Sequence, residues 1–112
     1  MADCIFCKMV AGEIKPDVVY EDEQILVFKD IHPQAPVHLL IIPKQHVATL
    51  NELDDPTLAS RLLLIVPQLA KQLGFSEEGY RTVINCNKKG GQEVYHIHLH
   101  VLGGRQLTWP PG

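Results

Sequence analysis

The chain has 112 residues, of which 46% are hydrophobic and 21% are charged, and its formal net charge at pH 7 is −3. This length favours a single domain over residues 1–112, and the acidic balance argues against a protein that binds nucleic acid through a basic surface. No apolar run approaches the roughly 20 residues of a membrane-spanning helix, and no secretory pattern opens the sequence, so we expect a cytoplasmic protein that does not insert into membranes.

The N-terminal half predicts a short helix and three strands. Asp3 can cap a helix that runs to about Ala11, because Gly12 follows as a stop signal. Strands are expected over residues 18–20, 25–29 and 37–43. The first two are joined by a polar turn, which is typical of a hairpin. The third is strongly apolar except for His38, a polar side chain whose burial requires an explanation.

The C-terminal half predicts one long helix and a second hairpin. Asp55 and Pro56 begin the helix, Gly74 ends it, and Pro67 is expected to kink it. Its apolar stripe consists of Leu58, Leu62, Ile65, Leu69 and Leu73. The hairpin strands are expected over residues 81–87 and 94–102, joined by the glycine-bearing turn 88–92. Together these elements predict an α+β fold with an antiparallel sheet covered on one side by the long helix.

Three histidines occupy alternate positions in the last predicted strand. Side chains of an extended strand alternate between its faces, so His96, His98 and His100 share one face. A neutral imidazole can act as nucleophile, acid, base or metal ligand near neutral pH. Three ligands in line converge poorly on one catalytic metal ion. The alternatives are an ordinary half-buried strand, or a division of roles in which the middle ring attacks an electrophile and His38 adds a further ring to the face.

The cysteines predict a metal site or free thiols. Cys4 and Cys7 have C-x-x-C spacing, and in a reducing compartment such a pair holds a metal ion or stays reduced more often than it forms a structural disulfide. A redox pair is a further alternative. Cys86 is interpreted as a small buried apolar residue.

The sequence resembles the histidine triad family, in which histidines alternate with apolar residues. The matching segments are Cys4-Ile5-Phe6-Cys7-Lys8, Ala35-Pro36-Val37-His38, Ile42-Pro43-Lys44-Gln45-His46, Gly91-Gln92-Glu93-Val94-Tyr95, His96-Ile97-His98-Leu99-His100-Val101-Leu102 and Trp109-Pro110-Pro111-Gly112. They cover nearly the whole chain and are similar to the purine nucleoside phosphoramidase branch of histidine triad nucleotide-binding proteins. This resemblance implies a five-stranded antiparallel sheet, one long and one short helix, and a homodimer across which the sheet extends.

The resemblance implies hydrolysis of the P–N bond of adenosine 5′-phosphoramidate-like substrates and of related acyl and aminoacyl adenylates. His98 would attack the α-phosphorus to form a nucleotidyl-histidine that water then cleaves. His100 would bind the phosphoryl oxygens, His38 would complete the cluster, and backbone N–H groups of residues 91–94 would stabilise charge. The alternatives are a dinucleoside polyphosphate hydrolase and a nucleotide-binding interaction module with little turnover.

The same resemblance implies two sets of contacts. Purine nucleoside monophosphates of the AMP or GMP type would contact Ile5, Phe6, Met9, Phe28, Asp30, Ile31, Leu40, Asn85, Gly91, Gln92, Glu93, Val94, His98 and His100. Structural zinc would bind Cys4, Cys7, His46 and His96. Some relatives carry serine where this chain has Glu93, which would repel phosphate or favour a cationic amine. Trp109 would anchor the dimer through the C-terminal tail.

Overall fold

The computed structural model describes residues 3–112, in which five strands form one antiparallel sheet in the order β1-β2-β3-β5-β4. The strands are β1 (Val18–Glu21), β2 (Ile25–Lys29), β3 (Val37–Pro43), β4 (Tyr80–Val83) and β5 (Leu99–Gly103). The helices are α1 (Ile5–Val10), α2 (Pro56–Leu73) and the short 3-10 helices η1 (Leu50–Glu52) and η2 (Lys88–Gly90). The predicted α+β class, the five-stranded sheet and the two α-helices are confirmed. Among residues 3–112, no helix combines the length and the apolar character that crossing a bilayer demands.

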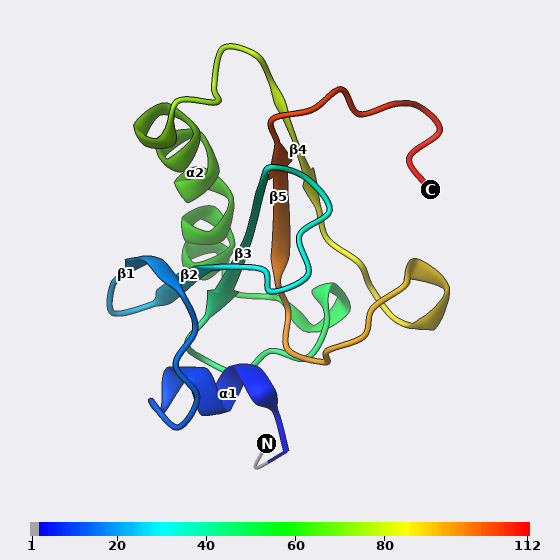
Figure 1. The fold of residues 1–112 in the computed structure, drawn as a ribbon. Helices are drawn as coiled ribbons and strands as arrows, with labels where there is room; N and C mark the ends of the chain where they lie inside the picture. The colour runs from blue at the N-terminus through cyan, green and yellow to red at the C-terminus, as the bar shows by residue number, and fades with distance from the viewer. Residues whose placement is uncertain (1–2) are drawn as a thin grey trace.

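The sheet separates two buried clusters, one on each face. Alternation along β2 sends Ile25 and Val27 to one face and Leu26 and Phe28 to the other. The larger cluster packs under α2, which Figure 1 shows lying along the sheet. The smaller cluster packs against Phe6 of α1 and forms the floor beneath the histidines. Because β2 and β3 are buried on both faces, they read as continuous apolar runs.

Strand register brings two distant histidines together. In the β3–β5 ladder, Leu40 lies opposite His100 and His38 lies opposite Leu102. Residues 38 and 40 point to the same face of β3, so His38 is the diagonal neighbour of His100. The central position of β3 in the sheet therefore places a histidine from each of two strands on one surface.

The long helix has the predicted ends. The Asp55 side chain accepts hydrogen bonds from the N–H groups of Thr57 (3.0 Å) and Leu58 (3.3 Å), and Gly74 ends the helix at φ 83°. The helix continues through Pro67, which lies on the exposed side. The prediction that Leu73 joins the buried stripe is wrong, because the chain turns at Gly74 and Phe75 fills that end of the core instead.

Predictions of a helix cap, of one side chain's burial and of two strand boundaries are wrong. Cys4, not Asp3, caps α1, and its sulfur accepts from the Cys7 N–H group (3.3 Å). Cys86 is half-buried rather than buried. The predicted strands 81–87 and 94–102 are paired only over 80–83 and 99–103. Between them the chain leaves the ladder, because the Ile97 N–H group bonds to the carbonyl of Val47 (2.6 Å) rather than to a neighbouring strand.

Candidate active site and metal cluster

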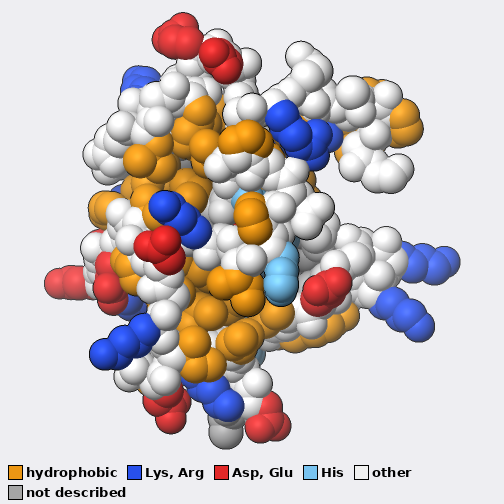
Figure 2. All heavy atoms as spheres, in the orientation of Figure 1, with side chains coloured by type: hydrophobic (Ala, Val, Ile, Leu, Met, Phe, Trp, Pro, Cys, Tyr) orange, Lys and Arg blue, Asp and Glu red, His pale blue; other side chains and the backbone are white. Residues whose placement is uncertain are grey.

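A cleft of about 610 Å³ lies on the sheet face that carries α1. Its walls include every predicted nucleotide-contact residue except Gln92, together with His38. Sequence reasoning missed further lining residues: Ile14, Lys15, Pro16, Lys29, His32 and Gln34. They belong to none of the matching motif segments. Figure 2 shows histidine side chains reaching the surface within a largely hydrophobic area.

His98 presents an unprotonated nitrogen because a backbone carbonyl fixes its proton. The ring donates from Nδ1 to the carbonyl oxygen of His96 (2.9 Å), and a carbonyl can only accept. The proton is therefore on Nδ1 and the lone pair on Nε2. The ring is 8% exposed, and Phe6 meets it edge to face with centroids 5.2 Å apart. A neutral, oriented imidazole with a free lone pair is suited to nucleophilic attack.

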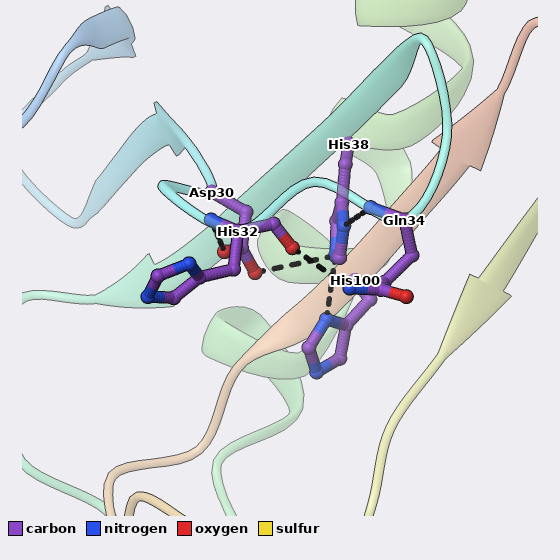
Figure 3. A network of polar contacts seen from close by, with 5 residues as sticks. All are labelled: Asp30, His32, Gln34, His38 and His100. Carbon is purple, nitrogen blue, oxygen red and sulfur yellow. Dashed lines mark hydrogen bonds and ion pairs between the residues drawn. The ribbon is translucent and has the colours of Figure 1, made fainter.

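His100 presents an N–H donor to the cleft, whereas His98 presents a lone pair. Hydrogen bonds among Gln34, His38 and His100, drawn in Figure 3, fix this arrangement. The Gln34 N–H group donates to His38 Nδ1 (3.0 Å), so His38 carries its proton on Nε2. That Nε2 donates to His100 Nδ1 (2.9 Å) and lies 3.4 Å from a carboxylate oxygen of Asp30. His100 therefore holds its own proton on Nε2 and can donate it to a ligand. The rings of His98 and His100 lie 5.0 Å apart, so the lone pair and the donor belong to one site.

Burial keeps the rings of His38 and His100 neutral. It lowers the pKa of His100 to about 4, with further lowering from His98 and His38. Burial also lowers the pKa of His38, against the opposing attraction of the Asp30 carboxylate. Both rings are therefore uncharged at neutral pH, as the hydrogen bonds between them require.

Cys4, Cys7, His46 and His96 form a second cluster that could hold a metal ion. Their ligand atoms all lie within 4.8 Å of one another, and the sulfur-to-Nδ1 distances are 3.4 Å for Cys4–His96 and 3.2 Å for Cys7–His46. Tetrahedral zinc bonds of about 2.3 Å to sulfur and 2.1 Å to nitrogen would place such ligands roughly 3.6 Å apart. The donor set and its spacing therefore fit a closed tetrahedral site.

The surroundings of His96 favour metal binding at the cluster. His96 donates from Nε2 to the carbonyl oxygen of Pro43 (2.7 Å), which leaves Nδ1 unprotonated and directed at the sulfurs. Burial lowers the pKa of His96 and so favours the neutral form that binds metals. Burial, together with Cys4, raises the pKa of the Cys7 thiol, and a bound cation would reverse this by stabilising the thiolate.

The group Asp30, His38 and His100 also lies within 4.8 Å but does not fit a metal ion. A metal on His38 Nε2 would move the ring proton to Nδ1, where the Gln34 N–H group already points. Two donors would then face each other. This group is better suited to fixing the proton of His100.

The loop between η2 and β5 is held by Gln92, which does not line the cleft. Its side chain accepts from the Asn87 N–H group (2.9 Å) and donates to the carbonyls of Ala48 (2.8 Å) and Val94 (3.1 Å). The N–H groups of Gly91 and Gln92 are bonded within the loop. Among residues 3–112, the N–H groups of Glu93 and Val94 bond to no protein acceptor. Of the four predicted backbone donors, these two are available to a ligand.

Comparison with known proteins matches residues 11–107 to the HIT domain family. The chain belongs to this family. A crystal structure of a HIT family hydrolase from Legionella pneumophila Philadelphia 1 superposes with a TM-score of 0.96, at 59% identity, over 98% of this chain and 100% of that one. The resemblance to the histidine triad family is thereby confirmed.

Two further HIT relatives are similar over almost their whole length. A HIT-like protein of Synechococcus elongatus is 54% identical over an alignment of 112 residues, which covers 98% of this chain and 97% of that protein. The purine nucleoside phosphoramidase of Escherichia coli is 45% identical over an alignment of 107 residues, which covers 94% of this chain and 90% of that enzyme. HIT proteins therefore include a named phosphoramidase at substantial identity to this chain.

Proposed function

We propose that this HIT protein is a purine nucleoside phosphoramidase, which hydrolyses the P–N bond of adenosine 5′-phosphoramidate-like substrates and related acyl adenylates. The observation that carries the proposal is the free Nε2 lone pair of His98, set by the His96 carbonyl inside the cleft. The similarity to the Escherichia coli phosphoramidase supports the choice of substrate. Without that similarity, the geometry supports only a histidine nucleophile beside a hydrogen-bond donor.

The proposed reaction has two displacement steps. His98 Nε2 forms a bond to the α-phosphorus, the substrate P–N bond breaks, and the leaving nitrogen takes up a proton from solvent, which the attacking water of the second step returns. The His96 carbonyl stabilises the positive charge that develops on the ring. His100 Nε2–H and the N–H groups of Glu93 and Val94 donate to the phosphoryl oxygens. Water then displaces the nucleotide from His98 and restores the neutral ring.

The nucleoside would lie along the apolar part of the cleft. Phe6 and its aliphatic neighbours provide a slot for the purine base. Asp30 is positioned for the ribose, because its carboxylate is held by the His32 N–H group (2.8 Å) and faces the cleft. A carboxylate oxygen can accept from both ribose hydroxyls. This placement puts the 5′ end of the nucleoside toward the histidines.

The cluster of Cys4, Cys7, His46 and His96 would hold structural zinc. The ligands come from α1, from the segment after β3, and from the segment before β5. Bound zinc would cross-link these three segments and fix the chain two residues before His98. The chain's own contribution is to direct the Nδ1 atoms of both histidines at the cysteine sulfurs.

The test of the proposed function is to mix the protein with adenosine 5′-phosphoramidate and, separately, with diadenosine polyphosphates. We expect AMP from the first substrate and a nucleotide adduct on His98 in rapidly quenched samples. His98→Ala should abolish turnover and retain AMP binding, because the base and ribose contacts remain. His32→Ala is the matched control. His32 lines the cleft, but its ring supplies neither the attacking lone pair nor the donor to the phosphoryl group.

Three other results would each contradict one part of the proposal. Near-parental turnover by His98→Ala would contradict the assigned nucleophile. AMP from the diadenosine compounds alone would indicate a dinucleoside polyphosphate hydrolase. Binding of AMP without hydrolysis of either substrate would indicate an interaction module.

A further inference from the structure

The segment that follows β5 holds the loop of residues 30–36 through two contacts. Arg105 donates from Nε to the carbonyl oxygen of Gln34 (2.9 Å). Gly104, at φ 90°, lies so close to Pro36 that a Cβ atom would come within 2.9 Å of the Pro36 Cβ. Neither residue touches the histidines. Both contacts reach a loop whose residues 31–34 are exposed and whose other hydrogen bonds join residues within 30–38.

Gln34 links this contact to the catalytic rings. Its carbonyl oxygen receives Arg105, and its N–H group donates to His38 Nδ1. His38 in turn donates to His100. Figure 3 shows Gln34 beside His38 and His100 below it, with dashed lines joining each to His38. A continuous set of hydrogen bonds therefore runs from Arg105 to the ring that would donate to the phosphoryl group.

We propose that Arg105 is a positioning residue that fixes which nitrogen of His100 carries the proton. If Gln34 shifts, His38 loses the donor that keeps its Nδ1 unprotonated. His38 can then carry its proton on Nδ1 and offer a lone pair at Nε2. His100 would have to donate to that lone pair from Nδ1, and its Nε2 would face the substrate as an acceptor. An acceptor repels a phosphoryl oxygen, so the site loses a donor although no catalytic side chain has changed.

The experiment compares Arg105→Met with Arg81→Met. Arg81 is the matched control, because it also donates to a carbonyl of the C-terminal segment, that of Thr108 (2.9 Å), but does not contact the loop. The first measurement is the ¹⁵N spectrum of the histidine rings, which distinguishes protonated from unprotonated Nδ1 and Nε2 without any substrate. We expect Arg105→Met to mix the tautomers of His38 and His100, and Arg81→Met to retain the parental spectrum.

The second measurement is turnover of adenosine 5′-phosphoramidate, and this part rests on the proposed function. We expect Arg105→Met to lower kcat about tenfold, with KM changed far less, because mixed tautomers weaken a donor whose complete removal costs on the order of 100-fold or more. Arg105→Lys, which keeps a donor of similar reach, should recover part of the loss.

The outcomes separate this inference from the proposed function. Parental tautomers in Arg105→Met would overturn the inference, as would an equal loss of kcat in Arg81→Met. A parental kcat in Arg105→Met would overturn its catalytic role. Mixed tautomers in Arg105→Met, combined with a parent protein that hydrolyses no phosphoramidate, would support the positioning of His100 and contradict the proposed function.

Discussion

Single backbone groups set the polarity of the histidine nitrogens. The carbonyl of His96 accepts from Nδ1–H of His98, the carbonyl of Pro43 accepts from Nε2–H of His96, and the N–H group of Gln34 donates to the unprotonated Nδ1 of His38. As a result, His98 presents a lone pair to the cleft and His100 presents a proton. The main chain therefore decides which nitrogen of each histidine carries the proton.

Stability should depend on pH through His100. Its pKa of about 4 in the folded protein is below the ordinary 6.5, so between these values the unfolded chain binds more protons. Stability is therefore fully present above pH 6.5 and falls as the pH is lowered toward 4. We expect Tm to drop between pH 7 and pH 4.5, and to drop less in His100→Asn. An equal drop in both proteins would show that other groups control the acid limb.

Glu93 should influence the choice of leaving group. Its exposed carboxylate lines both the catalytic cleft and a neighbouring hollow of about 370 Å³ that also contains Asp3 and Tyr95. A cationic amine about 4 Å from a carboxylate gains roughly 1 kcal/mol in water, which is about fivefold in rate.

We therefore expect Glu93→Gln to reduce the preference for a diamine phosphoramidate over a neutral-amine one by about fivefold. The measurement is the ratio of the two kcat/KM values, with Glu23→Gln in the exposed β1–β2 turn as the control. A ratio unchanged from the parent would remove Glu93 from leaving-group selection.

The residue types of the candidate site could largely be predicted from the sequence. Which histidine nitrogens carry protons, and which main-chain groups decide this, could not. Alternating histidines and a C-x-x-C pair are visible as patterns, and the structure brings both sets into clusters. Gln34 and Arg105 carry no such pattern. Their roles come from main-chain groups and from a contact across 71 positions, which no local spacing encodes. The motif around Gln92 predicts a nucleotide contact, whereas the Gln92 side chain is bonded within the loop and to Ala48.

At the level of elements, the strand boundaries depend on pairing rather than on propensity. Residues 94–98 alternate apolar and polar side chains as a strand would, but only β5 from Leu99 onward finds neighbours on both sides. The preceding segment instead bonds to Val47 and supplies His96 to the group of cysteines and histidines that could hold a metal ion. The ends of α2 and the central strands were predictable because capping residues and apolar runs are local signals.

The metal cluster should stabilise the attachment of α1. Removing the metal by chelation, or replacing Cys7 with serine, should lower Tm, because the thiolate ligand that joins α1 to the β5 segment is lost. A loss of about 1 kcal/mol corresponds to roughly 4–8 °C in a domain of this size. Calorimetry with elemental analysis measures both effects.

Cys86→Ser is the control for the metal prediction, because Cys86 is half-buried and lies outside the cluster. Parental Tm and zinc content in Cys7→Ser would exclude the cluster as a metal site. Loss of zinc without a change in Tm would show that the metal does not support the fold.

The whole molecule exposes apolar surface that a second copy could cover. Leu63 and Leu64 of α2 are 58% and 63% exposed, Trp109 is 81% exposed, and β4 is an edge strand. Figure 1 shows the C-terminal segment leaving the body of the chain. These features favour the proposed homodimer, in which edge strands and long helices of two subunits would pair.

Sedimentation should therefore report about twice the chain mass of 12.6 kDa. Introducing charge with Leu63→Asp and Leu64→Asp should shift the protein toward monomer, because burying an unpaired carboxylate at an interface is costly. Gln45→Asp, at another exposed position, should not. A parent that sediments as a monomer at micromolar concentration would contradict the dimer.

The placement of the two buried clusters on opposite faces of one sheet has an evolutionary consequence. Most of the apolar core lies beneath α2, whereas the cleft rests on the smaller cluster beside α1. Substitutions that reshape the cleft can accumulate while the main core keeps the chain folded. Descendants of such a scaffold can acquire new ligand preferences without first acquiring a new architecture.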